Sequence, residues 1–244
     1  MNSDNVIVDR EWGEIPIVLS KRAKRIIFKV VEGCLCVVVP VAVQVDERYL
    51  LQLVDANRVA LQRMLDRAVC RNRVAHLFSG KVIKTMEGEI HILSDDKLEC
   101  NCVRSLRQGN CLYVYYSAEN DIEEPRYERF VSRFIVGRMR AMWGKVLCDM
   151  VLDYAGQYSL RVADVRVGQG RSTLGHCSRR GVITISAYVL FYPHHLRRFI
   201  VCHELAHLTY FNHSDDFHRL CNSYCQGNEG QWKKESNAFA FPIM

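Results

Sequence analysis

Long apolar runs are missing from this chain of 244 residues. The longest, from Cys34 to Val43, is interrupted by Pro40, whereas a membrane-spanning helix needs roughly 18 or more apolar residues. Residues 1–14 contain acids where a secretory signal would have a basic and then an apolar segment. We therefore expect a cytoplasmic protein with no membrane partner.

A disulfide framework is missing as well. The eleven cysteines are an odd number and include no CxxC pair, unlike the compact, even sets of small secreted proteins. Two CxC pairs, Cys34/Cys36 and Cys100/Cys102, lie on expected strands, where both side chains of a pair share one face. They could bind metal, but we favour small strand residues because tetrahedral zinc sites usually draw on a CxxC turn.

Charge of one sign is only mildly in excess, with a net charge of +6. The excess is partly local, in the run from Lys21 to Arg25 and in the pairs Arg179-Arg180 and Arg197-Arg198. Nucleic acid is a possible partner for such charges. However, the sequence has no helix-turn-helix, paired zinc-finger or RNP-like pattern, so we favour a solvated basic face.

Repeats, low-complexity tracts and Gly/Ser/Pro-rich linkers are also absent. In the first half, residues 25–39 predict two strands joined by a tight turn at Glu32-Gly33. Asp46 is expected to cap a helix that reaches about Cys70. Residues 74–117 carry short apolar stretches separated by polar turns, which predict several strands of an antiparallel sheet.

The second half alternates between helix and strand signals. A helix is predicted from Pro125 to about residue 154, with a core-facing stripe of apolar residues at three- and four-residue intervals: Phe130, Phe134, Ile135, Met139, Met142, Val146 and Met150. Strands follow in residues 160–187, with a turn at Ser178–Gly181, then a helix from Pro193 to about Asn212. The class is therefore α+β, with a β-rich region that contains one helix in residues 1–120 and a second region in residues 121–244, or one continuous domain.

The stretch from His203 to His213, HELAHLTYFNH, carries the strongest chemical signal. Residues four apart lie one above the other on a helix face, so His203 and His207 can direct their imidazoles at one metal ion. Glu204 lies about 100° further round the helix and would flank the ion without binding it. A carboxylate there can take a proton from a zinc-bound water, so we predict one Zn²⁺ per chain with Glu204 as the catalytic base.

His213 is the favoured third metal ligand, ahead of Glu235 and His218. An unbroken helix would place it about 600° round from His207, off the ligand face, so the chain must turn sharply before it. Asn212 tolerates the left-handed conformation that ends helices, and Ser214 is expected to cap the next helix.

The sequence resembles the YgjP-like zinc metallopeptidases, within the zincin-fold group that includes SprT-like proteases. The family pattern HELxHL, a short spacer and NHSxxFW corresponds here to residues 203–208 and 212–218. Upstream, residues 174–177 and 181–186 resemble the family's WGSC and NITLN segments, and Pro193 precedes the motif as in the family. The resemblance is detailed over residues 160–225, loose over 15–70 and absent over 74–120. It departs at Leu174, His176 and His218, which puts substrate preference in doubt.

The resemblance implies a zincin-like domain that hydrolyses peptide bonds of a peptide or protein substrate. In such peptidases an edge strand pairs with the extended substrate, and here it would be formed by Val182, Ile183, Thr184 and Ile185, although an ordinary core strand fits the same sequence. The reacting oxyanion needs a further donor besides zinc, for which Tyr210, His176 and His218 are candidates. The competing hypothesis is a non-catalytic zinc-stabilised binding module, possibly DNA-associated; retention of Glu204 favours hydrolysis.

Overall fold

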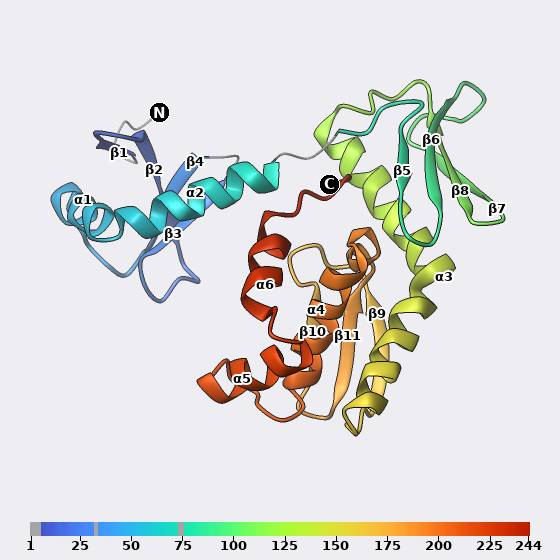
Figure 1. Ribbon diagram of the computed structural model, residues 1–244. Helices are drawn as coiled ribbons and strands as arrows, with labels where there is room; N and C mark the ends of the chain where they lie inside the picture. The colour runs from blue at the N-terminus through green and yellow to red at the C-terminus, as the bar shows by residue number, and fades with distance from the viewer. Residues whose placement is uncertain (1–5, 32–33, 73–75) are drawn as a thin grey trace. The chain divides into compact units, whose positions relative to one another are not determined.

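The computed structural model describes residues 6–31, 34–72 and 76–244 (Figure 1). Contacts within the chain divide it into two compact units, residues 1–73 and 74–244. The sequence analysis placed a division at residue 120 instead. The difference arises because the sheet formed by residues 82–117 packs its buried face against the long helix that follows, in one continuous core.

The first unit is built on a four-stranded sheet. Its strands are β1 (Val6–Asp9), β2 (Gly13–Ser20), β3 (Ile27–Val31) and β4 (Cys34–Pro40), in the order β1-β2-β4-β3. β3 and β4 are the two antiparallel strands predicted for residues 25–39. The predicted turn at Glu32-Gly33 lies outside the described residues.

Two helices, α1 (Glu47–Ala56) and α2 (Arg58–Asn72), replace the single helix predicted after Asp46. Asp46 does cap α1, since its Oδ1 accepts from the Tyr49 amide at 2.8 Å. The break falls at Asn57, whose side-chain amide donates to the Leu53 carbonyl at 2.8 Å. Asparagine side chains compete in this way with helical backbone bonds, which a hydrophobic period does not reveal.

The second unit begins with a sheet of β5 (Val82–Lys84), β6 (Glu89–Asp95), β7 (Val103–Gln108) and β8 (Cys111–Ser117), in the order β5-β6-β8-β7. The expectation of a purely antiparallel sheet is wrong, because β6 and β8 are parallel. The connection after β6 carries the chain to the edge, and the β7–β8 hairpin then returns β8 to the side of β6.

The long helix α3 (Pro125–Gln157) runs beside both sheets of this unit (Figure 1). Ile135 and Met139 are fully buried, as predicted, but Phe130 and Val146 are exposed. A stripe read at fixed intervals drifts around a straight helix over 33 residues. No helix in the described part of the chain has both the length and the apolar content to cross a bilayer.

The second sheet of this unit has three strands, β9 (Asp164–Gly168), β10 (Gly175–Cys177) and β11 (Val182–Ser186), in the order β10-β11-β9. β11 pairs with β10 on one side and β9 on the other. The predicted turn after β10 is present, with Gly181 at φ +75° and its amide donating to Ser178. A buried 3₁₀ segment, η1 (Ala187–Phe191), follows.

Three helices complete the unit: α4 (His194–Ala206), α5 (Asp215–Tyr224) and α6 (Glu229–Ala238). Helix α4 ends six residues before the predicted end at Asn212. The chain tightens there into i→i+3 bonds, from the Leu208 amide to Leu205 and from Thr209 to Ala206. Asn212 is not in the left-handed conformation proposed for it. Ser214 caps α5 as predicted, with its hydroxyl accepting from the Phe217 amide.

A buried ion pair joins α4 to the first sheet of the unit. The Arg197 guanidinium donates to both carboxylate oxygens of Glu87, and the exposed fractions of the two side chains are only 3% and 9%. Arg197 also donates to the carbonyls of Leu190 and Tyr192. These contacts satisfy the buried charge on every side and fix the start of α4.

Replacing Glu87 with alanine is expected to lower the free energy of unfolding by about 3–5 kcal/mol, because a buried guanidinium loses its counter-charge. Urea unfolding followed by circular dichroism measures the change. The matched control is Lys145→Ala, which breaks an exposed Lys145–Asp149 pair and should leave stability nearly unchanged. Equal effects of the two substitutions would contradict the role assigned to the buried pair.

Candidate metal centre

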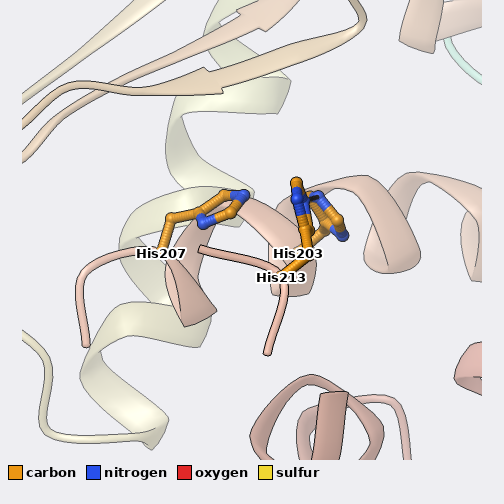
Figure 2. Close-up of side chains that lie close together, drawn as sticks. All are labelled: His203, His207 and His213. Carbon is orange, nitrogen blue, oxygen red and sulfur yellow. Dashed lines mark hydrogen bonds between the residues drawn. The ribbon is translucent and has the colours of Figure 1, made fainter. Parts of the chain in front are cut away.

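Three imidazoles from the stretch between His203 and His213 meet at the end of α4. His203 lies in the last turn of the helix, His207 caps its C-terminus and His213 lies in the loop before α5. One ligand atom from each falls within 4.8 Å of the others. Figure 2 shows the ring of His207 pointing toward the neighbouring rings of His203 and His213. The early end of α4 is what turns the chain back and brings His213 to the other two.

The spacing of the nitrogen atoms suits a tetrahedral metal ion. The Nε2 atoms of His203 and His213 are 3.1 Å apart, and two nitrogens bound at about 2.0–2.1 Å to one zinc would be separated by about 3.3–3.4 Å. His207 Nδ1 lies 2.9 Å from the Tyr210 carbonyl. Because a carbonyl only accepts, Nδ1 must hold the proton, which leaves Nε2 with a free lone pair for a metal.

Loss of solvent favours the neutral form of half-buried His203 and, to a smaller extent, of His213, which is exposed. Burial lowers the pKa of His203 to about 3, and the neighbouring His207 and His213 lower it further. The pKa of His213 is also lowered, mainly by burial. His203 Nδ1 is buried without a hydrogen-bond partner among the described residues. A cluster of neutral, close-packed imidazoles is the form in which histidine binds metal.

Phe217 supports the three rings from one side. It is fully buried at the start of α5, and its ring centroid lies 4.9, 4.5 and 4.8 Å from those of His203, His207 and His213. The Ser214 cap that begins α5 therefore also sets the position of this ring. The aromatic contact limits the rotamers of the three histidines.

Glu204 lies on the same helix turn but faces β10. Its side chain is buried, and burial raises the pKa of the carboxyl to about 7, opposed by a hydrogen bond from the Cys177 amide. Gly175 is pressed against the carboxylate, because a Cβ there would lie 2.4 Å from Glu204 Oε1. The sequence analysis did not single out Gly175 or Cys177 for this role. Both residues lie in the segment of residues 174–177, upstream of the motif, and its resemblance to the family's WGSC segment was the signal that could have indicated them.

The other candidate residues are bound to other side chains or exposed. The His218 ring stacks beside His213, with centroids 6.2 Å apart, but its Nδ1 donates to Glu229 at 2.7 Å. Glu235 accepts from His195 at 2.7 Å, so this alternative ligand is engaged elsewhere. The side chains of Tyr210 and His176 are exposed.

The strand predicted to pair with substrate has no free edge. Both sides of β11 are occupied, so the assignment of Val182, Ile183, Thr184 and Ile185 as a substrate-pairing strand is wrong. The edge strand next to Glu204 is β10 instead. The order of strands follows from long-range pairing, which the pattern of residues 182–185 does not encode.

The basic pair Arg197-Arg198 does not contribute to a basic surface. Arg197 is bound to Glu87, and Arg198 donates to the Tyr224 carbonyl at 2.9 Å while its guanidinium lies over the Tyr154 ring. Both arginines therefore stabilise the packing of α4. A nucleic-acid partner receives no support from them.

A family model described as the YgjP-like metallopeptidase domain matches residues 24–237. The chain belongs to the YgjP-like family. Metallopeptidase domains use a metal ion, typically zinc, and act on a peptide or protein substrate. Membership of the family therefore indicates, at the level of the family, that the chain is a hydrolase. The match extends across residues 74–120, which the sequence analysis could not relate to the family.

Among solved structures, the crystal structure of the metallopeptidase zymogen of Pyrococcus abyssi abylysin is similar over 37% of this YgjP-like chain and 90% of its own. The sequence identity is 22% and the TM-score 0.34. No curated protein matches the chain.

Replacement of His213 by alanine is expected to weaken zinc binding by more than about 100-fold, because loss of even an outer partner of a ligand costs about 10–100-fold. Competition against a fluorescent zinc chelator measures the affinity. His218→Ala is the matched control, since His218 is a neighbouring histidine already bound to Glu229. If His218→Ala weakens zinc binding more than His213→Ala does, the third ligand has been assigned wrongly.

Proposed function

We propose that this YgjP-like protein is a zinc-dependent peptidase with His203, His207 and His213 as metal ligands and Glu204 as the catalytic base. The observation that carries the proposal is the convergence of three imidazoles, one of them next in sequence to the buried carboxylate of Glu204. A purely structural zinc site usually has four protein ligands. In the described part of the chain the group that surrounds this point contains three, which leaves one position for water or substrate.

The donor set fits zinc, which accepts imidazole nitrogens in tetrahedral geometry. When bound, zinc would lower the pKa of a water to about 7 and polarise the peptide carbonyl. The hydrogen bond from His207 to the Tyr210 carbonyl orients one ligand, and Phe217 restricts all three. The protein thus holds the imidazole nitrogens of the three histidines in position for a metal ion.

Glu204 would take the proton from the attacking water and pass it to the leaving amine. A base works best when its pKa lies near the working pH, and burial raises that of Glu204 to about 7. The Cys177 amide and Gly175 hold the carboxylate in place from the side of β10.

In the described part of the chain no strand pairs with the outer edge of β10, and this supports binding of an extended substrate by added-strand pairing. Leu174 accepts from the Ser186 amide and Ser178 donates to Val182, so the alternation of an antiparallel ladder directs the backbone of Gly175 and Cys177 away from β11. The amide of Cys177 meets Glu204. The remaining outward backbone groups of Gly175 and Cys177 lie beside the Glu204 carboxylate, where an extended peptide would pair with them.

The decisive experiment replaces Glu204 with glutamine and measures zinc content together with cleavage of casein. We expect zinc to be retained and the cleavage rate to fall by about 10²–10⁴-fold, the usual contribution of a general base. Zinc-loaded wild-type protein that cleaves no peptide, or a glutamine variant of equal activity, would refute the proposal and leave the non-catalytic module.

Gly175→Ala tests the contact that positions the base. The new methyl group would overlap Glu204 Oε1 and force the carboxylate to move, for which we expect an activity loss of about 100-fold, the order seen for a misplacement of about 1 Å. Zinc content should not change. Gly137→Ala is the control, because its methyl group would make only an ordinary 3.6 Å contact; similar losses in both variants would speak against the positioning role.

A further inference from the structure

Three potential metal ligands also gather on the sheet of β5 to β8, away from α4. Glu89 and His91 are two residues apart on β6, so their side chains share a face. Cys111 begins β8 and is the register partner of Glu89. One ligand atom from each residue lies within 4.8 Å of the others. This is a carboxylate, an imidazole and a thiol at one point of a rigid sheet.

The imidazole nitrogen that faces this point has no hydrogen-bond partner among the residues that the structure describes. His91 Nε2 is buried and unpartnered, although Glu89 Oε2 is only 3.3 Å away, because the orientation does not suit a hydrogen bond. A buried polar atom without a partner costs free energy. The same 3.3 Å matches two ligands of one tetrahedral ion, whose bonds of about 2.0–2.2 Å place them about 3.3–3.5 Å apart.

The surrounding sheet holds the three side chains in place. The His91 ring stacks on Tyr113, with centroids 4.7 Å apart and planes at 16°. The alternate residues Ile90, Ile92 and Leu112 are buried in the core on the opposite face, so neither strand can rotate. A metal at this point would therefore need little rearrangement of the backbone.

We propose that Glu89, His91 and Cys111 form a second metal site, selective for a zinc-like divalent ion. Thiolate and imidazole donors favour zinc over magnesium or calcium, which prefer all-oxygen sites. Lys84 lies 3.7 Å from the other oxygen of Glu89, Oε1. Its side chain is 81% exposed, so it can move into solvent when a cation binds. The chain would then bind two ions at saturation, one on β6 and β8 and one at the end of α4.

Cobalt(II) distinguishes this second site from the histidine site. Cobalt bound by a thiolate gives a charge-transfer band in the near ultraviolet, whereas three histidines give none. Metal-free full-length protein is titrated with cobalt(II), and bound metal is counted by equilibrium dialysis. We expect the band in the wild-type protein together with two bound equivalents. Cys111→Ser should abolish the band and reduce the count to one.

Cys148→Ser is the matched control, since Cys148 is a free, half-buried cysteine of the same unit that lies on α3; it should keep the band. Glu89→Gln, which retains the thiol and the size of the side chain, should weaken cobalt binding and lower the band at subsaturating metal. Circular dichroism checks that each variant is folded. Absence of the band in wild-type protein or its persistence in Cys111→Ser would overturn the proposal. Saturation at one equivalent with the band present would instead count against the histidine site of the proposed function. None of these readouts depends on peptidase activity.

Discussion

The candidate site depends on how helix α4 ends. Two histidines on successive turns can meet a third only if the chain leaves the helix immediately after the second one and reverses. The i→i+3 bonds after Ala206 produce that exit, and the Tyr210 carbonyl, which the same turn brings back, fixes the tautomer of His207. Ser214 then starts α5, whose buried Phe217 packs against all three imidazoles. One local change of direction therefore sets the positions of the three imidazoles and their packing.

A second constraint acts on the carboxylate beside them. Glu204 is buried in contact with the backbone of β10, at a glycine where no side chain would fit. The same burial that holds the carboxyl raises its pKa to about 7. Strand β10 therefore shapes the environment of the Glu204 carboxyl group.

Two charged side chains of the second unit, Arg197 and Arg198, are used inside it. Arg197 joins α4 to the first sheet through Glu87, and Arg198 binds the end of α5. Because α4 carries the HELAH motif, these buried contacts fix the platform from which the imidazoles project. Arg197 and Arg198, one of the basic pairs in the sequence, thus support the helix that carries His203. The sheet of β5 to β8 also carries Glu89, His91 and Cys111, for which we propose a separate metal site.

The sequence by itself determined the features that depend on neighbours a few residues away. These are the α+β class, the spacing of His203 and His207 on one helix face, the Asp46 and Ser214 caps and the strands of residues 25–39. Only the tertiary structure decided where α4 ends, which strand lies at the edge, and that Glu87 and Gly175 meet Arg197 and Glu204. Helical period and capping are local, whereas strand order and burial depend on contacts between distant segments, whose pairing no short pattern records.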